Sequence, residues 1–207
     1  MTGSIPTTIE EQIAYVGRLM FERHLTDLSG GNISVRVGEQ VYITPRYSGS
    51  QQHWNVQPET VLTGSFRSNE LLDHPNLSRE GKAHIEVYRH FPEARAILHA
   101  HPFYVLPFCA AERAIEPVLE NTEKFGVIKP LPYAPTHTQE LADIIVAGLK
   151  AKEALITRHS AVLLLARHGL FTVSTDLFKC LDATERINWN AWCILAKAMM
   201  PVGVTPD

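Results

Sequence analysis

Residues 77–102 constrain the chain most, because there a helix pattern leads directly into a short apolar strand that carries two histidines. Residues 96–100 are mostly small and apolar and have a proline on either side, which is typical of a short buried strand. Side chains of a strand alternate between its two faces, so His99 and His101 should point to the same side. Two imidazoles on one side, spaced by one residue, can bind a single metal ion.

A third histidine, His168, lies in the turn-forming sequence Arg167-His168-Gly169. With His99 and His101 it would complete a three-histidine set with an open coordination position, the arrangement of catalytic zinc sites. Of the ten histidines, the other seven, such as His53 and His90, are interpreted as surface residues because they lie in polar stretches.

Glu80, just before the helix pattern that leads into this strand, is the candidate acid or base and a candidate fourth ligand. A carboxylate beside a divalent cation can ligate the cation and can also shuttle a proton. The alternative is a first-turn glutamate that is stabilised only by the helix dipole, which is common. The position of Glu80 next to the histidine strand favours the functional hypothesis.

Glycines, short polar residues and two arginines are candidates for binding an anionic substrate group. Backbone amides at a glycine pair and short hydroxyl or amide side chains can cradle an anion, and arginine can pair with a phosphate or carboxylate. Ordinary turn chemistry and solvated arginines are the alternatives. The candidates are Gly31, Asn32, Thr44, Arg46, Ser78 and Arg79.

The order of the predicted elements indicates a single α/β domain that spans residues 1–207. Helix patterns cover about residues 8–24, 78–91, 104–111, 138–149 and 176–199, and strand patterns cover residues 33–37, 40–44, 60–66, 96–100, 161–166 and 170–173. Ile33, Val35 and Val37 alternate with Ser34 and Arg36, which predicts a half-buried strand. Short turns between strands favour a largely antiparallel or mixed sheet.

Composition narrows the range of functions. A net charge of −3 without a basic stripe argues against nucleic-acid binding, and no apolar run approaches the length of a membrane span. The N-terminus lacks the pattern of a signal peptide. Cys109, Cys180 and Cys193 are odd in number and lie in apolar surroundings, so we expect buried thiols and a cytoplasmic protein.

Several separated motifs resemble the class II aldolase/adducin family across nearly the whole chain. They are GGNISVR followed by ITP, SREGKAHIEVYRHFPEARAILHAHP, PYAPTHTQELA and ARHGLFTVSTDLFKCLDATE. The resemblance implies a three-layer α/β/α domain with a central, mostly antiparallel sheet, usually assembled as a homotetramer. It also implies a zinc ion held by His99, His101 and His168, with Glu80 as acid/base and optional further ligand.

The implied activity is a reversible retro-aldol cleavage of a small phosphorylated ketose or related sugar acid, giving dihydroxyacetone phosphate or a similar product plus an aldehyde. A pentulose-phosphate 4-epimerase, a sugar-phosphate dehydratase or decarboxylase, and a non-catalytic adducin-like module are the alternatives. The chain departs from the aldolases where it has Arg46-Tyr47-Ser48-Gly49 after ITP and Ser78-Arg79 before Glu80. These positions belong to the phosphate cradle, so a carboxylate, or a phosphate that is placed differently, is the alternative anionic group.

Overall fold

Seven strands form one sheet in the order β3-β2-β1-β4-β7-β6-β5 in the computed structural model, which describes residues 6–200. Every neighbouring pair is antiparallel except β5 and β6, which run parallel. The strands are β1 (Asn32–Val37), β2 (Gln40–Ile43), β3 (Leu62–Ser65), β4 (Ala96–Ala100), β5 (Pro130–Leu131), β6 (Ala161–Leu165) and β7 (Gly169–Ser174). The predicted mixed, mostly antiparallel sheet is confirmed.

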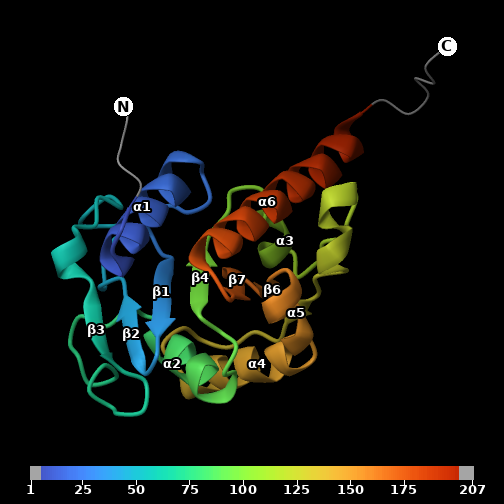
Figure 1. The fold of residues 1–207 in the computed structure, drawn as a ribbon. Helices are drawn as coiled ribbons and strands as arrows, with labels where there is room; N and C mark the ends of the chain where they lie inside the picture. The colour runs from blue at the N-terminus through green and yellow to red at the C-terminus, as the bar shows by residue number, and fades with distance from the viewer. Residues whose placement is uncertain (1–5, 201–207) are drawn as a thin grey trace.

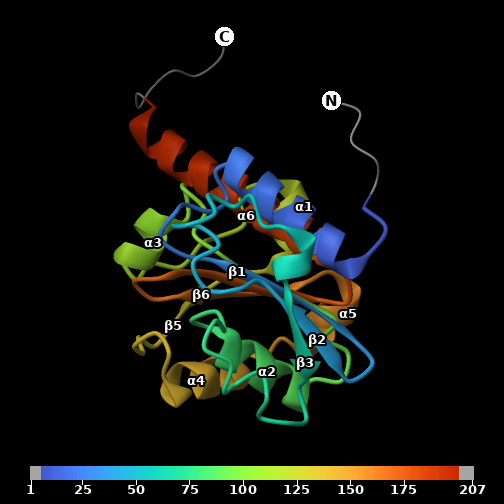
Figure 2. The same ribbon diagram turned by 90° about the vertical axis from the view of Figure 1, so that its left-hand side faces the viewer.

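Helices cover both faces of this sheet (Figure 1). They are α1 (Ile9–Glu22), α2 (Gly81–His90), α3 (Leu106–Ala110), α4 (Gln139–Lys150), α5 (Glu153–Arg158) and α6 (Leu177–Met199), with 3₁₀ turns at Pro58–Thr60 and Glu120–Phe125. Figure 2 shows α1 and α6 on one side of the sheet and α2 and α4 on the other, which confirms the three-layer α/β/α prediction. None of the helices within residues 6–200 is long and apolar enough to cross a membrane.

Local sequence signals fix where the longer helices begin. Thr8 and Glu11 form a capping box at the start of α1, and Thr138 and Asp176 cap α4 and α6 through their side chains. The helix predicted from about residue 78 begins later, at Gly81. Ser78–Glu80 instead form a turn, closed by the Gly81 N–H donating to the Ser78 carbonyl oxygen at 2.9 Å.

The prediction of a half-buried strand at β1 is wrong. Both faces of β1 are covered: Ile33 and Val35 pack beneath α1, while Ser34 and Arg36 are buried toward α2. The guanidinium of Arg36 donates to the Tyr88 and Pro92 carbonyl oxygens. The polar residues Ser34 and Arg36 on this strand therefore bond to buried side-chain and backbone groups and do not face water.

The surface interpretation is also wrong for one of the seven remaining histidines. His84, on α2, is fully buried, and its Nδ1 lies 2.6 Å from the Ser34 hydroxyl, which in turn lies 2.8 Å from the Tyr88 hydroxyl. Burial lowers the pKa of His84 from its ordinary 6.5 to about 3. Among the cysteines, Cys109 and Cys180 are buried and Cys193 is only partly so; all three are free.

The buried His84 should make stability depend on pH. Between pH 6.5 and about 3 an unfolded His84 takes up a proton that the folded one does not, so the free energy of unfolding falls as pH decreases. From pH 7 to pH 5 the wild type should lose about 2 kcal/mol more than His84→Asn. Urea denaturation at both pH values measures this, with the exposed His90→Asn as control. An equal loss in wild type and His84→Asn would contradict the assignment.

Candidate active site

Strand register brings the candidate residues together at one end of the central strands. Asn32 on β1 lies directly opposite His99 on β4, and His99 lies opposite Phe171 on β7. His101 follows β4 immediately, and His168 occupies the turn between β6 and β7. One side-chain nitrogen from each of His99, His101 and His168 lies within 4.8 Å of the other two, so the structure groups the three predicted histidines.

A close packing contact keeps the β6–β7 turn against the end of β4. A Cβ atom at Gly169 would stand 2.4 Å from the Ala100 carbonyl oxygen and 2.9 Å from the His101 ring. Any other residue there would push His168 and His101 apart. The glycine of the predicted His-Gly turn is therefore required by packing.

Hydrogen bonds fix the tautomers of His99 on β4 and of His101 just after it. His99 Nδ1 lies 2.8 Å from the Leu170 carbonyl oxygen, an acceptor, so Nδ1 carries the proton. His101 Nδ1 faces Asp27 Oδ1 and the Ser29 hydroxyl oxygen, each at 3.4 Å. Since the Ser29 hydroxyl already donates to Asp27, both oxygens act as acceptors toward His101. The Nε2 atom of each ring therefore presents a lone pair.

These nitrogens fit a metal ion. His99 Nε2, His101 Nε2 and His168 Nδ1 are buried and have no hydrogen-bond partner within the described residues. Burial holds the pKa of His99 well below its usual range and, with the neighbouring His101 and Arg79, lowers that of His168 to about 4. These two rings are thus neutral at physiological pH, the state in which imidazole ligates a metal.

Glu80 lies beside this histidine cluster and is 4% exposed. It occupies the N-cap position of α2 but makes no capping hydrogen bond. Asn32 Nδ2 donates instead to Glu80 Oε2 at 2.6 Å, and Glu80 Oε1 lies 3.7 Å from His168 Nε2. Burial raises the pKa of Glu80, and the Asn32 hydrogen bond partly opposes this. The carboxylate is therefore turned toward His168 and not toward the backbone N–H groups of α2.

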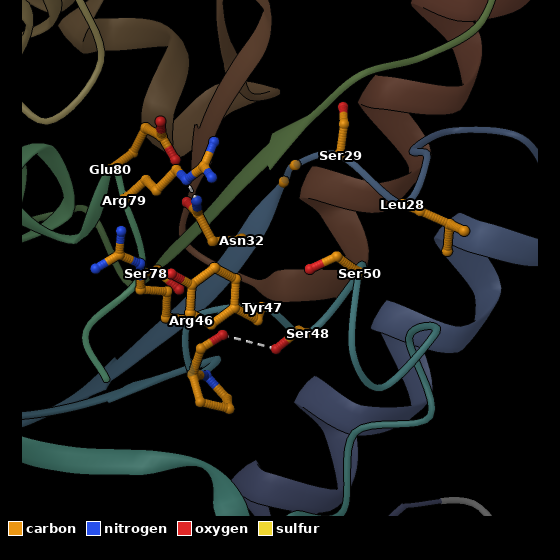
Figure 3. Close-up of a pocket in the computed structure, with 14 residues that line it drawn as sticks. Leu28, Ser29, Asn32, Arg46, Tyr47, Ser48, Ser50, Ser78, Arg79 and Glu80 are labelled. Carbon is orange, nitrogen blue, oxygen red and sulfur yellow. Dashed lines mark hydrogen bonds between the residues drawn. The ribbon is translucent and has the colours of Figure 1, made fainter. Parts of the chain in front are cut away.

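A cavity beside Glu80 collects five of the six predicted substrate-binding residues (Figure 3). Its lining includes Gly31, Asn32, Arg46, Ser78 and Arg79, together with Tyr47 and Ser48, which follow Arg46 in the chain. Thr44 lies behind the cavity: its hydroxyl accepts the Ile33 N–H at 3.1 Å, and its carbonyl oxygen accepts the Ser78 hydroxyl proton. Thr44 therefore ties the strand ends together.

Arg46 and Arg79 give the cavity its positive charge. Neither forms a salt bridge or a side-chain hydrogen bond with another described residue, although Arg46 stacks over the Tyr47 ring at 4.9 Å. Both lie close enough to His137 to lower its pKa after the effect of burial. The cavity thus brings two uncompensated guanidinium groups toward whatever anion enters it.

The loop before β1 contains a residue that sequence reasoning missed. Asp27 Oδ1 accepts the backbone N–H groups of Ser29 and Gly30 at 2.8 and 3.2 Å, which is an Asx-type turn, and also faces His101. The Asp-x-Ser spacing predicts such a turn, but only the folded chain places it beside His101. Trp54, fully buried, anchors this loop by donating its indole N–H to the Asp27 carbonyl oxygen.

The fold and site define an α/β/α domain with a three-histidine cluster suited to a metal ion and a buried carboxylate beside it. The family described as Class II Aldolase and Adducin N-terminal domain matches residues 11–195, and the chain belongs to this family.

Relatives within the family include more than one activity. The chain is 28% identical to an L-fuculose phosphate aldolase of Methanococcus vannielii over 168 residues, covering 81% of this chain and 84% of the relative. It is also 28% identical to a 3-oxo-tetronate 4-phosphate decarboxylase of Haemophilus influenzae, covering 88% of this chain and 84% of the relative. Among solved structures, the L-fuculose-1-phosphate aldolase of Thermus thermophilus aligns with a TM-score of 0.76 at 23% identity. The alignment covers 94% of this chain and 96% of that structure, so the two proteins share the fold.

Proposed function

We propose that the protein is a metal-dependent lyase that carries out reversible retro-aldol cleavage of a small phosphorylated ketose or related sugar acid. The observation that carries this proposal is the buried Glu80 carboxylate, held by Asn32 next to three imidazole nitrogens that have no hydrogen-bond partner in the described part of the chain. The products would be dihydroxyacetone phosphate, or a similar compound, and an aldehyde. We expect a cytoplasmic protein and, as the family resemblance implies, a homotetramer.

His99, His101 and His168 would hold the metal, zinc or another divalent ion, and Glu80 would be a further ligand when no substrate is present. When bound, such an ion supplies a Lewis acid that polarises a substrate carbonyl and stabilises negative charge on its oxygen. The fixed Nδ1 protons of His99 and His101 keep their ring orientation, so little reorganisation is needed.

Glu80 moves the proton in this mechanism. Its raised pKa, caused by burial, brings the carboxyl closer to the pH at which it can both take and return a proton. Asn32 holds Oε2, which leaves Oε1 as the oxygen that faces the histidine cluster and exchanges the proton with the substrate carbon. The Gly31 backbone and the Ser78 turn, with Arg46 and Arg79, bind the anionic end of the substrate.

A decarboxylase acting on a 3-oxo sugar-acid phosphate is the second candidate. The observation that favours it is the pair of uncompensated arginines in one cavity, which matches a substrate with both a phosphate and a carboxylate. The Haemophilus influenzae relative, whose substrate is 3-oxo-tetronate 4-phosphate, supports this candidate.

A substrate panel separates the two candidates. The purified protein, loaded with zinc, is incubated with L-fuculose 1-phosphate, 5-deoxy-D-ribulose 1-phosphate and 3-oxo-tetronate 4-phosphate, with and without a chelator. Chelator-sensitive aldehyde release from a ketose phosphate supports the aldolase, whereas carbon dioxide release from the sugar acid supports the decarboxylase. Turnover that is insensitive to complete metal removal would refute both.

Neutralising Arg79 tests the anion site. Arg79→Gln should raise KM for the accepted substrate about tenfold or more, because a charge-assisted hydrogen bond contributes roughly 1.5–3 kcal/mol. The kcat value should change much less, since Arg79 binds a group that does not react. Steady-state kinetics measures both, with Arg158→Gln, an exposed arginine at the end of α5, as control. An unchanged KM in Arg79→Gln would remove this residue from the site.

A further inference from the structure

We propose that Asp27 is a positioning residue that sets the metal affinity of the histidine cluster by acting on His101. This inference rests on the proposed metal site and adds to it a carboxylate that would not touch the metal itself. A histidine ligand that donates its second ring N–H to a carboxylate is held in one tautomer and orientation, and its ligating nitrogen becomes more basic.

The contact is made through the ring nitrogen that does not face the cluster. Asp27 Oδ1 lies 3.4 Å from His101 Nδ1, while His101 Nε2 is buried without a partner among the described residues. The His101 side chain is 11% exposed, whereas the Asp27 side chain is 47% exposed. One edge of the ring thus meets a charged acceptor at the surface, while the ring centroid lies 5.1 Å from that of His99 and 5.4 Å from that of His168.

The surrounding loop is built to hold Asp27 against this ring. The Asp27 carboxylate accepts the Ser29 hydroxyl at 2.7 Å as well as two backbone N–H groups, so its position is fixed within its own turn. A Cβ atom at Gly30 would stand 2.3 Å from His101 Cε1, which shows how closely the loop backbone lies on the imidazole. The Thr26 hydroxyl donates to the Gly30 carbonyl oxygen at 2.9 Å and locks this approach.

His99 on β4 and His101 just after it are oriented by acceptors of different charge. His99 donates to a neutral backbone carbonyl, that of Leu170, deep inside the sheet. His101 donates instead to an anion, the Asp27 carboxylate, whose Oδ1 lies 3.4 Å from His101 Nδ1. Removing the charge at Asp27 should therefore weaken His101 as a ligand while leaving His99 unaffected.

The experiment compares zinc affinity in wild type, Asp27→Asn and Asp27→Ala by competition with a chromophoric chelator at pH 7.5. Asparagine can form the same turn and accept the same hydrogen bonds, so Asp27→Asn isolates the charge. We expect zinc binding to weaken by about 10- to 100-fold in Asp27→Asn, and at least as much in Asp27→Ala. Asp143→Asn, which neutralises a carboxylate bonded to Gln139 on α4, should bind zinc as wild type does.

Two further measurements, the cobalt spectrum and the melting temperature, distinguish a role at the metal from a role in loop stability. The cobalt-loaded protein should show altered visible absorption in Asp27→Asn at an unchanged melting temperature, because a residue that only shaped the loop would alter stability and not the ligand field. Wild-type zinc affinity and cobalt spectrum in Asp27→Asn would overturn the inference and leave the metal site intact. A wild type that binds neither ion would refute the metal site, and this inference with it.

Discussion

Glu80→Gln should lower turnover by about two to four orders of magnitude, the range over which a positioned acid or base contributes to catalysis. The glutamine carbonyl can still accept the hydrogen bond from Asn32 Nδ2, so the side chain should stay in place. What the variant loses is the proton that Glu80 exchanges with the substrate. Single-turnover kinetics with the accepted substrate measures the change, and metal content is determined in parallel.

The melting temperature of Glu80→Gln gives an independent test of the assignment. Because burial penalises the charged form of Glu80 and raises its pKa, a neutral glutamine there should leave the melting temperature unchanged or raise it. Glu39→Gln, at an exposed residue paired with Arg67, is the matched control and should retain full activity. Full turnover in metal-loaded Glu80→Gln would exclude the acid/base role.

His99→Ala should abolish metal binding and activity together. His99 is the fully buried member of the cluster, and its Nε2 has no alternative protein partner among the described residues. We expect zinc affinity to fall by more than about 100-fold, since losses at outer partners of a metal ligand alone reach that size. Metal analysis after dialysis, together with activity after reloading, tests the expectation.

The same substitution leaves a cavity in the sheet, so the fold must be checked separately. Truncating a buried side chain of this size costs roughly 2–5 kcal/mol, which circular dichroism and thermal unfolding will show. His168→Ala, at a less buried position in the β6–β7 turn, should lose metal with a smaller loss of stability. His90→Ala, exposed on α2, is the control for histidine removal. Full metal occupancy in His99→Ala would show that the site is assigned wrongly.

The sequence by itself determined the order of the longer elements and the chemical types at the site, whereas the short β5 and α5 were not predicted. Capping residues and apolar periodicity located the ends and faces of the helices, because these signals act over a few residues and need no tertiary partner. The His-x-His spacing placed two imidazoles on one side of β4 for the same reason. The match to residues 11–195 confirms the family that the separated motifs indicated.

Where buried polar residues lie was decided by tertiary structure alone. The alternation in β1 indicated one solvent-exposed face, but α2 covers that face. Ser34 and Arg36 are therefore buried and form hydrogen bonds with residues of α2. His84 stands in a polar stretch of sequence yet is enclosed between α2 and the sheet. Local pattern cannot reveal which face a second helix will cover, because this depends on contacts between residues far apart in the chain.

The residues around the histidine cluster show the same difference between what local sequence predicts and what tertiary contacts decide. The chain supplied His99, His101, His168 and Glu80 as candidates, but strand register set Asn32 opposite His99 and turned the glutamate toward the cluster. Asp27 carried no signal of its role, since a turn aspartate looks the same whether or not an imidazole lies above it. Residue type and short spacing fix what chemistry is available, and long-range packing fixes which groups meet, because only the folded chain sets their distances and burial.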